Sequence, residues 1–227
     1  MVIVLAAGCQ VRSTVDVSMA SDGSGRVRVA VVLDREAAAK VPDLKASLRI
    51  EDLTAAGWQV VGPTPVTGGG VRLTATRSFA GPAQGNLILA ELSGDNGPFR
   101  DLKLARSHSF GKDSYRLDGT LDVSKGLDTF ADSAFLQTLG ASRADQVLGG
   151  DVGANPPTIA LSVHLPGSGQ VTTKSAALGQ APVAVHVSSQ RRSGSAFLLA
   201  GVAVAALAGL VLTGALVVLT RVRSRRP

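Results

Sequence analysis

A run of 25 residues without a charged side chain, from Ala196 to Thr220, constrains this chain more than any other feature. An α-helix rises about 1.5 Å per residue, so a helix over this run extends about 37 Å. That length crosses a hydrocarbon core of about 30 Å with some tilt. A buried helix of a soluble protein is the alternative, but such helices rarely run so far without a polar face. The sequence therefore predicts a transmembrane helix over residues 196–220.

Arginines flank the predicted span unequally. Two precede it, Arg191 and Arg192, and four follow it. Because positive charge is retained on the cytoplasmic side, the excess after the span predicts a cytoplasmic C-terminus. Residues 191–195 then form a linker, residues 221–227 form a basic cytoplasmic tail, and the preceding domain is extracytoplasmic at the cell membrane. The residues that set this topology are Arg221, Arg223, Arg225 and Arg226.

The first nine residues, MVIVLAAGC, resemble the end of a bacterial lipoprotein signal peptide. An apolar run leads through Ala7 and Gly8 to Cys9, the single cysteine. The resemblance implies that the Cys9 thiol takes a diacylglyceryl group and becomes the new N-terminus after cleavage. Ala6 departs from the pattern, and no Lys or Arg precedes the run, as expected if translation starts upstream of Met1. A cysteine buried in an N-terminal strand is the alternative. Lipidation is favoured because an unpaired cysteine in an exported chain needs an explanation.

Basic and acidic residues balance within the domain between the two predicted anchors, over residues 10–190. The chain has 23 lysines and arginines against 17 aspartates and glutamates, and six of the basic residues are the arginines around the span. The domain therefore carries 17 charged side chains of each sign. The net charge of +6 comes from the membrane flanks and gives no support to nucleic-acid binding, which needs a basic folded domain.

Alternating apolar residues and turn signals predict a domain of hairpins and a few helices. Strands are expected over residues 11–20, 26–34, 58–66, 71–79, 99–110, 114–123, 158–165 and 182–188. Helices are expected over residues 35–40, 42–56, 82–92 and 127–139. Hairpins interleaved with helices are typical of an α+β domain with a mainly antiparallel sheet and two or three packed helices, to which the C-terminal transmembrane helix is added.

The layout of the chain resembles the actinobacterial LppM-like membrane lipoproteins. The shared features are Gly8-Cys9-Gln10-Val11-Arg12 leading into a strand, the Asp22-Gly23-Ser24-Gly25 turn, the strand end at Leu165-Pro166-Gly167, the mixed α+β domain and the single C-terminal span. The resemblance covers nearly the whole chain. It implies a surface lipoprotein that binds envelope lipids or glycolipids and catalyses no reaction. The sequence departs from the family after Gly167. The family implies a further strand with a tryptophan there, but residues 171–187 contain no tryptophan.

Apolar residues recur at helical spacing over 127–139 and predict an amphipathic helix. Three of them, Leu127, Phe130 and Phe135, are candidates to line a lipid pocket between this helix and the sheet. The same pattern also makes an ordinary close-packed core. Both interpretations remain open at this point because a sequence shows no internal volume.

No catalytic constellation, metal site or cofactor site is predicted. Leu117-Asp118-Gly119-Thr120-Leu121 is similar to the haloacid-dehalogenase phosphatase signature, but Arg116 stands where that chemistry needs a nucleophilic aspartate. Gly68-Gly69-Gly70 lacks the lysine and helix of a phosphate loop and is interpreted as a hairpin turn. The histidines fall on separate predicted strands without metal-ligand spacing, at His108, His164 and His186. We therefore expect no enzymatic activity.

These features predict an envelope lipoprotein, anchored through Cys9 and the span, whose outward-facing domain binds a lipid or glycolipid. The alternative is a structural or protein-interaction module of the cell envelope without a bound ligand. Gly201, Ala205 and Gly209 recur at four-residue spacing in the span and allow self-association there, although small residues are common throughout it. The expected partners are the membrane, its lipids and other envelope proteins, and no nucleic acid.

Overall fold

The computed structural model describes residues 11–40, 50–93, 97–109, 111–126 and 156–192. Several sequence predictions fall outside the described residues. These are the lipidation site Cys9, the helix over 127–139, the span over 196–220 and the topology-setting arginines Arg221, Arg223, Arg225 and Arg226. No helix within the described ranges is long and apolar enough to cross a membrane.

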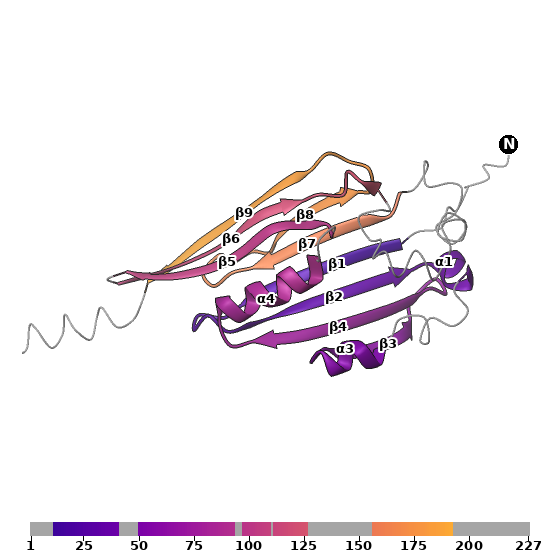
Figure 1. The fold of residues 1–227 in the computed structure, drawn as a ribbon, viewed down its shortest axis with the longest axis horizontal. Helices are drawn as coiled ribbons and strands as arrows, with labels where there is room; N and C mark the ends of the chain where they lie inside the picture. Colours follow the sequence, from indigo (N-terminus) through magenta and orange to yellow (C-terminus); the bar gives the residue numbers. More distant parts are fainter. Residues whose placement is uncertain (1–10, 41–49, 94–96, 110, 127–155, 193–227) are drawn as a thin grey trace, which may run out of the picture. The chain divides into compact units, whose positions relative to one another are not determined.

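A six-stranded sheet is the main element of the fold, with the order β3-β4-β2-β1-β7-β8 (Figure 1). Its strands are β1 (Val11–Met19), β2 (Gly25–Leu33), β3 (Gln59–Pro65), β4 (Val71–Phe79), β7 (Thr158–His164) and β8 (Thr172–Ala177). Four of its strand pairs are antiparallel, and β1 and β7 are parallel. The predicted α+β domain with a mainly antiparallel sheet is therefore confirmed for the part that the structure describes.

A second sheet contains three strands in the order β5-β6-β9. They are β5 (Phe99–Ser109), β6 (Lys112–Leu121) and β9 (Val183–Arg192). Helix α4 (Pro82–Ser93) contacts β2 and β4, while α1 (Arg35–Lys40) and α3 (Ile50–Ala55) are short. Buried side chains of both sheets and of α4 form one hydrophobic core, which includes Val17, Val27, Ile88, Leu117 and Leu161. The six-stranded sheet therefore has an inner face on this core and an outer face turned away from it.

The alternating pattern of β1 explains these two faces. Val15 and Val17 are buried on the inner face, whereas Arg12, Thr14 and Asp16 belong to the outer face. Side chains alternate between the two faces of a strand, so a period of two separates the core residues from the outward polar residues. The predicted hairpin of β1 and β2 is confirmed.

The turn between β1 and β2 is fixed by hydrogen bonds. Asp22 Oδ1 accepts them from the hydroxyl of Ser24, at 2.7 Å, and from its backbone amide, at 2.9 Å. These bonds favour the carboxylate and lower the pKa of Asp22 below its usual value. Two residues of the second sheet also reach this turn: Tyr115 donates to the carbonyl of Ser21 at 2.8 Å, and Arg106 donates to that of Asp22 at 2.6 Å. The turn therefore joins the two sheets.

The chain forms two compact units. Of the described residues, the larger takes those of the ranges 11–106 and 115–189 and contains the hydrophobic core. The smaller takes the described residues of the ranges 107–114 and 190–192. Within the smaller unit, His108 Nδ1 lies 2.9 Å from Asp113 Oδ1.

Several element boundaries differ from those predicted. The sequence analysis missed β8, because only Ala176 of its six residues is buried and the strand lacks an apolar face. Strand β9 continues to Arg192, beyond the predicted residue 188. Its last residues are polar and mostly exposed, so the sequence shows no apolar alternation there. Helix α3 begins at Ile50, and residues 42–49 of the predicted helix lie outside the described ranges.

We predict that Asn86→Ala destabilises the domain by about 2–3 kcal/mol, because it leaves two buried backbone groups without partners. Asn86 on α4 donates to the carbonyl of Leu104 at 3.1 Å and accepts from its amide at 2.7 Å. Leu104 is only 2% exposed. Denaturation of the full chain in detergent, followed by fluorescence of the single tryptophan Trp58, measures the loss. Leu87→Ala on the same helix is the control, since Leu87 is 71% exposed, and equal losses in both variants would contradict the prediction.

Candidate functional site

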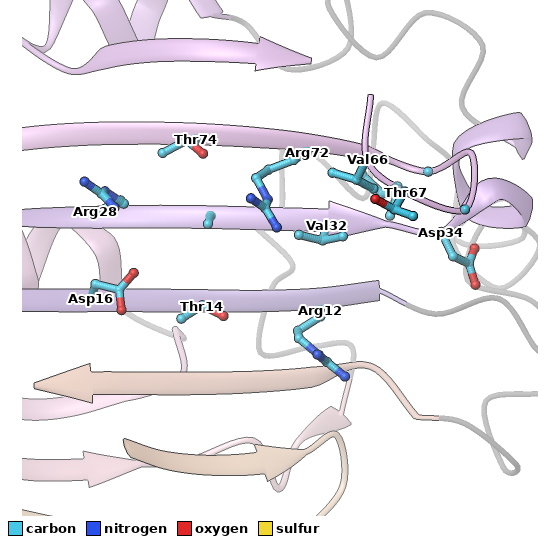
Figure 2. A pocket seen from close by; sticks show the side chains of 14 residues that line it. Arg12, Thr14, Asp16, Arg28, Val32, Asp34, Val66, Thr67, Arg72 and Thr74 are labelled. Carbon is cyan, nitrogen blue, oxygen red and sulfur yellow. The ribbon is translucent and has the colours of Figure 1, made fainter. Parts of the chain in front are cut away.

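A groove of about 640 Å³ lies on the outer face of the six-stranded sheet. Side chains of β1, β2 and β4 form its floor and sides, and the turn between β3 and β4 closes one end (Figure 2). The sequence analysis did not identify this groove. Its shape follows from three neighbouring strands that place small residues on their outer face between longer ones.

The register of the strands arranges the floor in rows. In the first row, Arg12 of β1 and Arg72 of β4 are the partners of Val32 on its two sides. Adjacent strands lie about 4.8 Å apart, so the Cα atoms of the two arginines are about 10 Å apart. Figure 2 shows the Arg72 side chain directed across β2 and Arg12 extending toward β7. Exposed side chains change rotamer within nanoseconds, so both guanidinium groups can approach a ligand above Val32.

The next two rows of the floor contain threonines, an alanine and an Arg–Asp pair of positions. Thr14 and Thr74 are the partners of Ala30, whose methyl group leaves the centre of the groove open. In the third row, Asp16 is opposite Arg28. Four residues separate Val32 from Arg28 along β2, which corresponds to about 13 Å. The groove therefore has an arginine row at one end and an Arg–Asp row at the other, with two threonines between them.

The glycine-rich turn forms the end wall. The amide of Val66 donates to Gly70 O at 2.9 Å, and the amide of Gly69 donates to Val66 O at 3.2 Å, which confirms the predicted hairpin turn. Gly68 and Gly69 have φ angles of 92° and 83°, which favour glycine. A Cβ atom on Gly70 would lie only 2.3 Å from the carbonyl oxygen of Leu33. Glycine therefore lets this turn approach the end of β2.

Positive charge exceeds negative charge in the groove, which is lined by three arginines and two aspartates. Arg12, Arg28 and Arg72 are exposed, and within the described part of the chain none of their guanidinium groups has an ion pair or hydrogen bond. Of the two lining carboxylates, Asp34 caps helix α1 and accepts a hydrogen bond from the amide of Ala37 at 2.8 Å. Guanidinium groups without counter-ions and nearby threonine hydroxyls are suited to an anionic ligand that also carries hydroxyl groups.

The predicted pocket residues are not among those that the structure describes. Leu127, Phe130 and Phe135 lie in the range 127–155, so the pocket that they were proposed to line stays a prediction. Between α4 and the sheet, Ile88 and Leu89 are each 1% exposed and belong to the packed core. The groove is on the opposite face of the sheet from these residues.

The histidines are not brought together. His108 belongs to β5, His164 ends β7, and His186 belongs to β9. His186 Nδ1 lies 2.5 Å from Asp118 Oδ1, and Arg116 Nε lies 3.0 Å from Asp118 Oδ2. These three side chains form an exposed array on β6 and β9. Over the described ranges, no group of three or more His, Cys, Asp or Glu residues is arranged to hold a metal ion.

The sequence carried one signal for the groove. Arg12, Arg28 and Arg72 each occupy an outward position of an alternating strand. That pattern indicates exposed arginines but leaves their neighbours unknown. Only the order β4-β2-β1 places the three arginines around one groove.

Comparisons with known proteins give one structural similarity. The sequence matches no protein-family model and no curated protein at a significant level. The structure is similar to the NMR structure of the folded domain of LppM from Mycobacterium tuberculosis, with a TM-score of 0.36 and 12% sequence identity. The match covers 83% of this chain and 92% of that domain. Membership of the LppM-like family therefore stays a prediction.

Proposed function

We propose that this chain is a membrane-anchored envelope lipoprotein whose outward-facing domain binds the anionic headgroup of a lipid or glycolipid. The observation that carries the proposal is the row in which Arg12 and Arg72 flank Val32 on the floor of an open groove. Neither guanidinium has an ion-pair partner among the described residues. An anionic ligand supplies the missing negative charge.

The chemistry of the groove fits a headgroup. A guanidinium presents a planar set of donors that binds a phosphate or carboxylate in a bidentate manner. The hydroxyl groups of Thr14 and Thr74 and the carboxylate of Asp16 suit the hydroxyl groups of a sugar or polyol. The arginines and threonines of the floor suit a headgroup better than an acyl chain, so the acyl chains of the ligand stay outside the groove.

The predicted lipid anchor supports the same ligand. Cys9 precedes Arg12 by three residues, and an extended chain of that length reaches about 10 Å at most. A diacylglyceryl group on Cys9 therefore keeps the Arg12 end of the groove near the bilayer surface. The headgroups of that bilayer are then within reach of this end of the groove.

A protein-interaction module is the alternative function, and it has weaker support. Exposed large apolar side chains are starting points for protein interfaces when they gather in one patch. Val61, Leu87 and Val171 are more than half exposed, at 62%, 71% and 59%. They belong to β3, to α4 and to the segment before β8, and so to separate elements.

Native mass spectrometry tests the proposal on the full chain, purified from bacterial membranes in a mild non-ionic detergent. We expect close to one anionic lipid bound per chain under native conditions. Denaturing spectra of the same sample remove this lipid and retain any covalent group on Cys9, so the two lipids are distinguished. Recovery of a folded chain without any non-covalent lipid would contradict lipid binding and favour the interaction module.

A further inference from the structure

We infer that the outer face of the six-stranded sheet lies against the membrane that anchors the chain, so that the groove takes its headgroup from that bilayer. This inference rests on the proposed anchoring through Cys9 and the span over 196–220. It adds an orientation and a membrane-contacting face to the proposed function. Two independent observations carry it: where the anchored ends leave the sheet, and how charge is distributed over its outer face.

The two anchored ends leave the larger unit from opposite ends of its central strands. Cys9 precedes the first residue of β1 by two positions. Strand β7 is parallel to β1, and its last residue, His164, is the partner of Ser18. Ser189 of β9 donates a hydrogen bond to the carbonyl of Pro166, just beyond that end of β7, at 2.9 Å. Ser189 therefore lies at the far end of β1 from Cys9.

Chain lengths exclude an upright domain. Strand β1 has nine residues and is about 30 Å long. The seven residues from Ser189 to the first residue of the span, Ala196, reach about 25 Å at most. With Cys9 at the bilayer, strands perpendicular to the membrane would raise Ser189 beyond that reach. The strands of the six-stranded sheet are therefore tilted away from the membrane normal.

Charge selects the face that is turned to the bilayer. The outward charged side chains of β1, β2 and β4 are one aspartate, Asp16, and the four arginines Arg12, Arg26, Arg28 and Arg72. None of these arginines has an ion pair within the described ranges. In the part of β6 and β9 that belongs to the larger unit, by contrast, Asp118 compensates Arg116 and contacts His186. The other exposed basic residues of these two strands, Lys112, Arg191 and Arg192, belong to the smaller unit. Each basic side chain near an anionic bilayer raises the affinity of the protein for that bilayer about fivefold. The outer face of the six-stranded sheet is therefore the face attracted to the bilayer.

Depth-dependent quenching tests this orientation. The full chain is reconstituted in phosphatidylcholine vesicles with and without phosphatidylglycerol, and single cysteines carry a fluorophore. Ser78→Cys labels the outer face of β4, and Ala184→Cys labels the exposed side of β9. Both positions are exposed, so labelling leaves the core intact. The parent chain is the unlabelled control, because the sulfur of its one cysteine, Cys9, carries the diacylglyceryl group under the proposed anchoring.

Lipids with a nitroxide on the headgroup should quench the label at Ser78→Cys several-fold more than the label at Ala184→Cys. The difference should grow with phosphatidylglycerol and shrink in an Arg26→Glu background, because Arg26 adds charge to this face outside the groove. Equal quenching at both positions, in a chain that floats with the vesicles, would overturn the orientation alone. A chain that does not float with the vesicles would overturn the proposed anchoring and the orientation with it. Preferential quenching at Ser78→Cys without a lipid in native spectra would support the orientation and contradict the headgroup site.

Discussion

The double variant R12E/R72E is expected to lose at least about 100-fold in affinity for an anionic headgroup. Each charge-assisted hydrogen bond contributes about 1.5–3 kcal/mol, and each glutamate adds repulsion where a guanidinium had bound the ligand. Both arginines flank Val32 on the groove floor. Titration of the full chain in non-ionic detergent with a short-chain phosphatidylglycerol measures the change. The fold should be unaffected, because both side chains are exposed.

R26E/K103E is the matched control for this variant. It changes the net charge by the same amount and replaces exposed residues outside the groove. Arg26 also lies on the outer face of β2, only two residues before the groove residue Arg28. Detergent removes the contribution of a continuous bilayer surface, so the control should retain its affinity. An equal loss in both variants would show that binding follows net charge and would contradict a specific site.

Leu161→Ala is expected to destabilise the domain by about 2–5 kcal/mol, because it leaves a cavity at the centre of the core. Leu161 is 0% exposed in β7, where Val15 of β1 is its parallel partner. The unfolding transition of the full chain in detergent, followed by fluorescence of Trp58, should move to lower denaturant concentration. Trp58 is 3% exposed, so its emission reports loss of the core.

Ser162→Ala gives the comparison for Leu161→Ala at the adjacent position. Ser162 belongs to the outer face of the same strand, and its hydroxyl lies 3.1 Å from that of Thr173 in an exposed pair. Removal of this contact should cost about 1 kcal/mol or less. A small effect of Leu161→Ala, equal to that of Ser162→Ala, would mean that β7 does not complete the core.

Local elements were predictable because local sequence determines them. The alternation of β1 and β2 and the Asp22–Ser24 turn predicted a hairpin, and the two strands pair along their whole length. Pro63 and Pro65 are typical of an edge strand, and β3 is at the edge of its sheet. Strand β8 was missed because its contribution is backbone pairing with β7 and only one buried side chain.

The groove was not predictable, because it depends on which strands are neighbours. Charge counting over residues 10–190 found 17 side chains of each sign and averaged away a local excess of arginine. The excess appears only when β4 pairs with β2 and places Arg72 in the same row as Arg12. The Gly68-Gly69-Gly70 segment was correctly interpreted as a turn, yet its role as an end wall depends on its close approach to Leu33.

The parallel pairing of β1 with β7 affects the order in which the chain can fold. A polypeptide that emerges N-terminus first can pair β1, β2, β3 and β4 early, because those strands are neighbours in sequence. The other edge of β1 then stays unpaired until residues 158–164 have emerged. An open strand edge is a template for pairing with other chains, and such long-range pairing is slow. The interval before β7 pairs is therefore the period in which this chain is most exposed to aggregation.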